Sequence, residues 1–377
     1  MKLEQREIGR IVGIEPGPTL VAVAGIHGNE PAGLEAAQRV FRRLASAGMQ
    51  LRGEFVVYAG NLASLRKGVR YQAKDLNRVW TEPRVTELLS RGPEALFDEE
   101  DREQLELLRL LGDAKSRARG TVHLADLHTT SAAGIPFILF GDTVAQRDFA
   151  SAFPIPIILG LEEQVDGVLS SYWTQRGCIT FAVEGGQHDD PVTTDSLEAV
   201  LWLALAQAGL FSEAQIPEVA RAAALLDEQR RGLPRVLEVV SRRSITPQDS
   251  FQMEPGFRNI DHAREGQLLA RDRTGEIRAP ADGLVIMPLY QGLGGEGYFW
   301  GREVSPARLK VADALRRLGV ERLLSLLPGV ARDPQHPARF ILGAKVARLY
   351  PLQVFHLLGY RRMRQHGDEL SLERQAG

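Results

Sequence analysis

The feature that most constrains the fold is a pattern in the first half of the chain. Short apolar runs end in glycine or polar residues and alternate with stretches of helical periodicity. The run from Thr19 to Gly25 is one example, and helical periodicity begins soon after it at residue 31. Runs of this length and character are typical of strands buried on both faces. Further strand-like runs span residues 55–60, 121–128, 136–141, 156–159 and 178–186.

Strands that alternate with helices predict an α/β fold, with a mixed, mostly parallel sheet flanked by helices on both faces. In such sheets, ligands bind outside the carboxyl ends of the strands. Three residues with useful chemistry fall at or just after the ends of apolar runs, namely His27, His128 and Glu184. We therefore expect all three to lie at one edge of the sheet.

The length of 377 residues favours two domains. The pattern of apolar and polar residues also changes along the chain. We expect a large domain over residues 1–213, which contains the strand-like runs and the three residues named above, and a helical linker over residues 214–232. Short apolar runs broken by Pro, Gly and Asp predict a small β domain over residues 233–301. Helical periodicity returns after that domain and predicts a helical C-terminal tail over residues 302–377.

Composition excludes several classes of protein. The 46 Lys and Arg residues against 48 Asp and Glu residues give a net charge of −2, so no overall field would recruit nucleic acid or an anionic membrane. The single cysteine, Cys178, excludes an internal disulfide, and its apolar surroundings predict a buried thiol. The first residues lack the apolar core of a signal peptide, and the most apolar helical run, 197–211, is too short to span a bilayer. We expect a cytoplasmic protein with a small-molecule substrate, and the sequence leaves open whether it forms a homo-oligomer.

Two imidazoles and one carboxylate make a set of ligands for a metal ion. His27 and Glu30 are three residues apart, and His128 ends a predicted strand. Such a set leaves one vertex of a tetrahedral zinc ion for water, which is typical of a hydrolytic site. Strand alternation puts Asp126 on the same side as His128, where it can orient the imidazole. The alternative is that Glu30 only favours the start of a helix at Pro31, and that the two histidines are ordinary polar residues.

Four separated motifs resemble those of a known family. The motifs GIHGNEPAG, RYQAKDLNRVW, DLHTT and VEGG occur in the order found in the succinylglutamate desuccinylase and aspartoacylase family, which is related to the zinc carboxypeptidases. The resemblance covers most of residues 19–186, weakens in the β domain and does not extend to the tail. It implies a zinc carboxypeptidase-like fold with one Zn²⁺ per chain, held by His27, Glu30 and His128.

The resemblance also implies roles for other residues. Glu184 of the VEGG motif would be the general base that takes a proton from the attacking water. Arg70 would stabilise the oxyanion, while Asn77 and Arg78 would bind a carboxylate of the substrate, a task that suits the planar fork of arginine.

The chain departs from the family at the acyl end of the substrate. Some members carry a further arginine upstream of the catalytic glutamate, which binds the acyl carboxylate. The nearest candidate here is Arg176, eight residues before Glu184, which differs slightly from the expected spacing. His188 is a further candidate for a residue of the pocket.

These features predict a zinc-dependent amidohydrolase that removes the acyl group from an N-acylated amino acid or a related small amide with a free carboxylate. A zinc carboxypeptidase acting on short or modified peptides is the alternative, because Asn77 and Arg78 could equally bind the C-terminal carboxylate of a peptide. A β domain over the cleft favours small substrates. A third hypothesis is a non-catalytic binding module that docks through the apolar segment 340–362, and a missing ligand or base would favour it.

Overall fold

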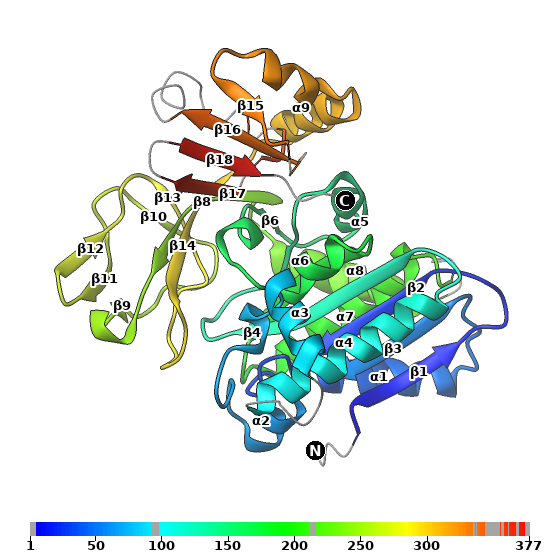
Figure 1. Cartoon of the computed structure of the whole chain (residues 1–377). Coiled ribbons are helices and arrows are strands. Elements are labelled where there is room, and N and C mark those ends of the chain that lie inside the picture. Colours follow the sequence, from blue (N-terminus) through cyan, green and yellow to red (C-terminus); the bar gives the residue numbers. More distant parts are fainter. Residues whose placement is uncertain are drawn as a thin grey trace.

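A computed structural model gives the fold of the chain (Figure 1), and it describes residues 5–91, 98–211, 216–334, 336, 338–343, 355, 358–360, 362–366 and 369–373. Its centre is an 11-stranded sheet with the strand order β1-β3-β2-β4-β7-β5-β6-β8-β14-β13-β10. The strands of this sheet are β1 (Glu7–Val12), β2 (Thr19–Ala24), β3 (Glu54–Ala59), β4 (Val122–Thr130), β5 (Phe137–Leu139), β6 (Ile157–Leu159), β7 (Ile179–Gln187), β8 (Val236–Ser244), β10 (Asp261–Ala263), β13 (Gly283–Ile286) and β14 (Glu296–Glu303).

The middle of this sheet is parallel. Strands β3, β2, β4 and β7 pair in parallel, as do β5, β6 and β8, whereas β1 and β5 run antiparallel to their neighbours β3 and β7. The helices around it are α1 (Ala32–Ser46), α2 (Leu62–Lys67), α3 (Glu82–Arg91), α4 (Glu99–Arg117), α5 (Val144–Ala150), α6 (Leu169–Thr174), α7 (Pro191–Gln207) and α8 (Pro217–Arg230). The expected α/β fold with a mixed, mostly parallel sheet is confirmed.

Helices cover both faces of the sheet because side chains alternate along its strands. In β2, Leu20 and Ala22 belong to the apolar cluster that also contains buried residues of α1, α7 and α8. The intervening Val21 and Val23 belong to a second cluster, with residues of α4 and α6. Figure 1 shows the resulting layers, with the strands between the two groups of helices.

The predicted linker helix is part of this packing. α8 lies within residues 214–232, and its apolar side chains Val219, Ala222 and Leu226 join the same cluster as α1 and α7. Burial of these side chains attaches α8 to the α/β layers of residues 1–213. The domain boundaries given above remain predictions.

The predicted β domain contains strands that extend the central sheet. β8 pairs with β6 on one side and with β14 on the other, and β13 and β10 follow in antiparallel order. A separate three-stranded sheet has the order β12-β11-β9, with β9 (Gln252–Met253), β11 (Leu268–Asp272) and β12 (Gly275–Arg278). The all-β character expected for residues 233–301 agrees with these strands, but one end of the region is continuous with the central sheet through the pairing of β8 with β6.

The prediction of a helical tail is wrong for most of the described residues after Leu326. A helix, α9 (Pro306–Arg317), begins the tail, and a short 3-10 helix follows at Val320–Leu326. The rest of the described tail forms a four-stranded antiparallel sheet with the order β15-β16-β18-β17. Its strands are β15 (Val330–Arg332), β16 (Arg339–Gly343), β17 (Arg362–His366) and β18 (Glu369–Glu373). The helical periodicity near the start of the tail does not continue to its end. The strands that follow pair with residues far away in the sequence, and local periodicity does not reveal such pairing.

The tail is anchored by a buried ion pair. Arg316 of α9 lies 3.3 Å from a carboxylate oxygen of Asp142 and donates a hydrogen bond to the Asp142 backbone carbonyl. Residues 344–354, 356–357 and 361 of the apolar segment 340–362 lie outside the described residues. Its described members Phe340, Leu342 and Phe355 are buried in the tail's own core, so they do not form a docking surface.

Two smaller expectations concern burial and membranes. Cys178 is buried, and burial raises the pKa of its thiol to about 11, which makes the thiolate scarce at neutral pH. Within the described part of the chain, we find no helix that combines the length and the apolarity needed to cross a bilayer.

Acid should destabilise the fold through His123 in β4. The ring is buried against Phe149, its Nδ1 has no hydrogen-bond partner among the described residues, and burial lowers its pKa to about 4. Because an unfolded histidine titrates near 6.5, the neutral ring contributes stability above that pH and loses it as the pH falls toward 4. The free energy of unfolding should fall between pH 7 and pH 4.5 in both proteins. We expect this fall to be about 2 kcal/mol smaller in His123→Gln than in the wild type.

Urea unfolding at both pH values measures this difference. His262→Gln, at an exposed position of β10, is the matched control and should retain the loss of the wild type. Equal acid losses in His123→Gln and the wild type would contradict the prediction.

Candidate active site

The loop after β2 carries the first two candidate ligands. His27 and Glu30 lie between the end of β2 and Pro31, the residue that caps the start of α1. A Cβ atom at Gly28 would come within 2.2 Å of the Ser64 carbonyl carbon, so the loop can pack against α2 only with glycine there. The Gly28 amide donates to the Arg70 carbonyl at 3.1 Å, which joins this loop to the segment that carries Arg70.

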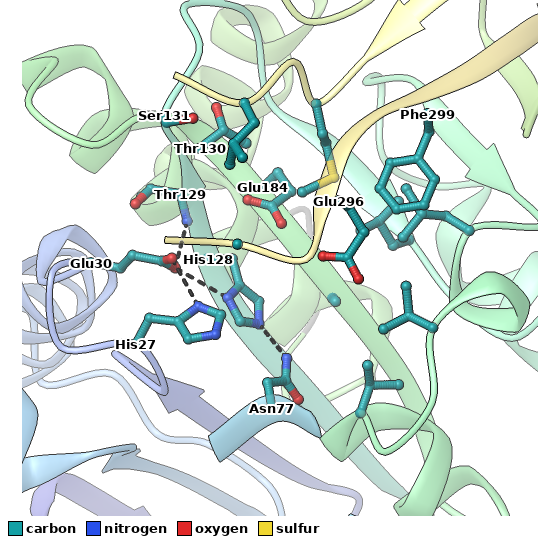
Figure 2. Close-up of a pocket in the computed structure, with 18 of the residues that line it drawn as sticks. His27, Glu30, Asn77, His128, Thr129, Thr130, Ser131, Glu184, Glu296 and Phe299 are labelled. Atoms are coloured by element: carbon teal, nitrogen blue, oxygen red, sulfur yellow. Dashed lines mark hydrogen bonds and ion pairs between the residues drawn. The ribbon is translucent and has the colours of Figure 1, made fainter. Parts of the chain in front are cut away.

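The three predicted ligands meet at the carboxyl ends of β2 and β4. One oxygen of Glu30 lies 2.9 Å from His27 Nδ1, and the other lies 3.1 Å from His128 Nδ1. One potential ligand atom from each of the three side chains lies within 4.8 Å of the others, and all three residues are buried. The second Glu30 oxygen also accepts a hydrogen bond from the Thr129 amide at 3.1 Å. Figure 2 shows His27 and His128 both turned toward Glu30.

A carboxylate lies at the far side of each imidazole. Asp126 Oδ2 is 2.9 Å from His128 Nε2, as strand alternation predicted. Asp75 Oδ1 is 3.0 Å from His27 Nε2, a contact that the sequence did not reveal. The other Asp75 oxygen accepts from Arg70 at 3.0 Å. Asp75 therefore links one candidate ligand to the arginine expected to stabilise the oxyanion.

This arrangement fits a divalent cation. When each Nε2 donates its proton to an aspartate, each Nδ1 presents a lone pair toward the Glu30 carboxylate. Three electron-rich atoms then face one another in a buried space, and a shared cation resolves that conflict. Two imidazoles and one carboxylate, with carboxylates behind the imidazoles, are a donor set that zinc commonly has.

The ionisable groups of this centre depend strongly on one another. Burial alone would raise the pKa of Glu30, but His27 and His128 hold it well below its ordinary value. Burial alone would lower the pKa of His128, but Asp126 and Glu30 hold it well above its ordinary value. Against the effect of burial, His27 and Arg70 also keep the pKa of Asp75 low.

Glu184 stands beside this centre on β7. It is the Cα partner of His128 on the neighbouring strand β4, so both belong to the same edge of the sheet. Its Oε2 is buried without a hydrogen-bond partner among the described residues. Burial, with the carboxylates of Glu30 and Asp126, raises its pKa to about 8 despite His128 and Arg70 nearby. Buried groups perturbed in this way are common at functional sites.

Comparison with known proteins identifies the family. A family model described as the succinylglutamate desuccinylase/aspartoacylase catalytic domain matches residues 16–206, which is just over half of the 377 residues. The chain belongs to this family. The family is one of hydrolases, so the expected resemblance and the broad class of activity are confirmed together.

Relatives of this family member differ in how much of the chain they match. A succinylglutamate desuccinylase from Burkholderia thailandensis is 28% identical over 264 residues, which cover 67% of this chain and 70% of that protein. The succinylglutamate desuccinylase of Pseudomonas paraeruginosa is 35% identical, but over 74 residues that cover 20% of this chain and 22% of that protein.

Solved structures of other proteins share the fold. A succinylglutamate desuccinylase/aspartoacylase from Rhodobacter sphaeroides aligns with a TM-score of 0.57 at 16% identity, covering 79% of this chain and 88% of that one. The product-bound ectoine utilization protein EutE from Ruegeria pomeroyi aligns with a TM-score of 0.55 at 21% identity, covering 78% and 87%. At these identities the likeness concerns the fold alone.

In this family member, the candidate ligands open onto a pocket. Arg70, Asn77, Arg78 and Glu184 line it with His27, Glu30 and His128. Arg70 lies 3.5 Å from Glu30, whereas Arg78 lies 3.3 Å from Glu296 of β14. The sequence thus identified most of the polar residues at the base of the pocket. It did not identify Glu296 or the other residues that the β-rich region contributes, Met287, Pro288, Leu289, Gln291, Gly294 and Phe299.

Asn77 has a more internal position than the sequence predicted. Its Oδ1 accepts from the Leu169 amide at 2.8 Å, and its Nδ2 lies 3.4 Å from Asp126 and 3.2 Å from His128 Nε2. The side chain therefore braces the Asp126–His128 pair from the short 3-10 helix η1 (Leu76–Arg78). Asn77 also lines the pocket.

Arg176 is not part of the pocket, and the structure corrects this expectation. Its guanidinium lies 3.4 Å from the centre of the Tyr172 ring and donates to Glu82 of α3 at 2.5 Å. The residue follows the last turn of α6, which directs its side chain toward α3. His188 is also absent from the lining, but its ring nitrogens contact two lining residues, Thr129 at 2.6 Å and Gln291 at 3.3 Å.

Removing the carboxylate behind an imidazole should weaken metal binding. We expect Asp75→Asn and Asp126→Asn each to lower the affinity for Zn²⁺ by roughly 10–100-fold, because the orientation and basicity of the bound imidazole depend on these carboxylates. Competition with a chromophoric chelator measures the affinity. Asp195→Asn, at an exposed position of α7, is the matched control. Unchanged zinc affinity in both variants would argue against a metal ion at this centre.

Proposed function

We propose that the chain is a zinc-dependent amidohydrolase that cleaves the amide bond of an N-acylated amino acid or a related small amide with a free carboxylate. The observation that carries the proposal is the buried convergence of His27, Glu30 and His128 beside Glu184, whose Oε2 has no hydrogen-bond partner among the described residues. Family membership supports the reaction class.

His27, Glu30 and His128 would hold the metal through Nδ1, a carboxylate oxygen and Nδ1. A zinc ion bound there would supply Lewis-acid chemistry to water and to the scissile carbonyl. Asp75 and Asp126 would accept the Nε2 protons of the two imidazoles, which fixes the tautomer that binds a cation.

Glu184 would move the proton. As water adds to the carbonyl carbon, Oε2 of Glu184 would accept a proton from it, and the same carboxyl would deliver that proton to the amide nitrogen as the carbon–nitrogen bond breaks. The products are a carboxylate and an amine. Burial raises the pKa of this carboxyl, and the positive charge of a cation held by the neighbouring ligands would lower it, which would favour the ionised form that accepts the proton.

The two arginines would have separate tasks. Arg70 is held by Glu30 and Asp75 next to the centre, so its guanidinium is positioned for the oxyanion that develops on the carbonyl oxygen. Arg78 is farther out and partly exposed, paired with Glu296 across the pocket. Arg78, together with the Asn77 amide group, would bind the free carboxylate of the substrate.

A carboxypeptidase that acts on short or modified peptides would use the same groups. Met287, Leu289 and Glu296, from the β-rich region, line the pocket together with the candidate catalytic residues. Walls of this kind limit the space for a long chain and favour a small amide. Parallel assays of N-acetyl amino acids, N-succinyl amino acids and dipeptides distinguish the two activities.

Glu184→Gln tests the assignment of the base. The amide cannot accept a proton from water, so we expect kcat to fall about 10²- to 10⁴-fold while the bound zinc per chain is unchanged. Amine release and metal analysis measure the two quantities. Glu276→Gln, on the exposed strand β12, is the control and should keep full activity. A wild-type chain that binds zinc but hydrolyses no amide in the assay panel would favour the non-catalytic binding module.

The two arginines should respond differently to lysine. Lysine keeps the charge but not the planar fork, so Arg78→Lys should raise KM several-fold with little change in kcat. Arg70→Lys should lower kcat about 10²-fold, since an oxyanion contact matters most in the transition state. Steady-state kinetics on one N-acyl amino acid decides the matter. An equal effect of both variants on KM alone would remove Arg70 from the oxyanion role.

A further inference from the structure

The pocket continues past Glu184, away from the metal centre. On the face of β7 that carries Glu184, the preceding side chain is Ala182. The Cα partner of Ala182 on β5 is Leu139. Both residues are buried and line the pocket. The floor beyond Glu184 is therefore apolar.

The walls around this floor are apolar too. Leu161, Val165 and Val168 come from the segment between β6 and α6, and Phe299 comes from β14. These four, Ala182 and Leu139 belong to one apolar cluster, and none is more than 8% exposed. We call these six residues the apolar subsite. In Figure 2, Glu184 lies between Phe299 on one side and His27 with Glu30 on the other.

The apolar subsite adjoins the proposed carboxylate-binding residues. The Leu169 amide donates to Asn77, and a Cβ atom at Gly167 would come within 2.3 Å of the Arg78 carbonyl oxygen. The segment that supplies Val165 and Val168 therefore packs directly on Asn77 and Arg78. Arg78 also contacts Glu296, which lies on the same strand as Phe299.

This arrangement orients an N-acyl amino acid. Its carboxylate and its side chain are attached to the same carbon atom, so a carboxylate bound at Arg78 brings the side chain to the neighbouring subsite. Its nitrogen must lie at Glu184 to receive the proton. Both conditions put the amino acid, rather than the acyl group, on the far side of Glu184 from the metal centre.

The charges around the subsite suit a side chain without charge. Apart from the two candidate histidine ligands, the cationic side chains among the described residues that line the pocket are Arg70 and Arg78. Arg70 lies at the centre with Glu30 and Asp75, and Arg78 would be taken by the substrate's own carboxylate. Apart from Glu30 and Glu184, the carboxyl groups among the described residues that line the pocket are Glu162, which accepts from the Ser170 hydroxyl at 2.7 Å, and Glu296, which pairs with Arg78. A second substrate carboxylate would thus be buried among apolar groups without a cation.

We propose that the amino acid released by this enzyme carries an uncharged apolar side chain, which fills the apolar subsite, and that aspartate and glutamate derivatives are poor substrates. The inference rests on the proposed function and narrows its substrate class. It sets this chain apart from relatives whose names specify succinylglutamate.

Leucine and aspartate derivatives provide the sharpest test, because the two side chains have nearly the same shape and differ in charge. With the zinc-loaded full chain, we expect kcat/KM for N-acetylleucine to exceed that for N-acetylaspartate about a hundredfold or more. The N-succinyl pair, assayed alongside, should show the same order. Nα-acetylornithine tests a cationic side chain at Glu162. A preference for the aspartate or the ornithine derivative would overturn the proposal.

Filling the subsite should change the preference in a defined way. Ala182→Val adds two methyl groups to the floor in a strand position that tolerates β-branching. We expect the ratio of kcat/KM for N-acetylleucine to that for N-acetylglycine to fall about tenfold, because glycine has no side chain to place there. Ala270→Val, at a buried alanine of β11, is the matched control and should leave the ratio as in the wild type. An unchanged ratio in Ala182→Val would place the side chain elsewhere.

Binding separates failure of this inference from failure of the proposed function. If none of the amides is hydrolysed, the proposed function fails, and calorimetry with zinc-loaded Glu184→Gln still decides the inference. Tighter binding of N-acetylleucine than of N-acetylaspartate supports the apolar subsite. Tighter binding of the aspartate derivative, or no binding of either, contradicts it. Hydrolysis with a preference for aspartate leaves the proposed function intact and rejects the inference alone.

Discussion

The site depends on one buried carboxylate with two imidazoles directed at it. Glu30 contacts His27 through one oxygen and His128 through the other, although these residues come from a loop and a strand far apart in sequence. A carboxylate buried to this degree is costly unless it is paired. The Thr129 amide and Arg70 add to the pairing, so the carboxyl ends of β2 and β4 and the Arg70 segment are held in one arrangement. That arrangement is also the one that a divalent cation requires.

The sequence revealed the parts of this site that depend on local pattern. Alternation along the predicted strand at residues 121–128 indicated that Asp126 and His128 share a face, and the structure places the two side chains in contact. The positions of His128 and Glu184 at strand ends indicated a common edge, because parallel strands end together. Family motifs then pointed to Arg70 and Arg78, which no periodicity could single out.

Contacts made by loops could not be predicted in this way. Asp75 reaches His27 because its loop is fixed by Glu100 of α4, which accepts hydrogen bonds from the amides of Gln72 and Ala73. Neither the loop path nor the helix position is encoded near Asp75. The prediction for Arg176 was wrong for the converse reason. Its spacing from Glu184 suggested a role in substrate binding, but the direction of α6 turns its side chain toward Glu82. The prediction of a helical tail was wrong because β16 pairs with β18, and the paired residues are about thirty positions apart in the sequence.

The continuity of the sheet explains how the β-rich region acts on the site. β8 pairs in parallel with β6 and antiparallel with β14, so the strand that carries Glu296 and Phe299 belongs to the same hydrogen-bonded sheet as β4 and β7. The apolar cluster that lines the subsite spans this junction, with Leu139 and Ala182 on one side and Phe299 on the other. The pocket wall is therefore fixed relative to Glu184 by packing and backbone pairing rather than by a hinged contact.

The order of strands in this sheet separates the residues proposed for substrate selectivity from those proposed for catalysis. The proposed metal ligands and Glu184 lie on or after β2, β4 and β7, whereas Phe299 and Glu296 lie on β14, several strands away in the sheet order. Side chains on β14 can change in size or charge without altering the contacts of Glu30 with its two imidazoles. Arg78 stands between the two groups, because it follows Asn77, which braces His128, and pairs with Glu296. A substrate carboxylate that binds Arg78 must compete with Glu296, so the charge on β14 bears directly on which substrates are held at the centre.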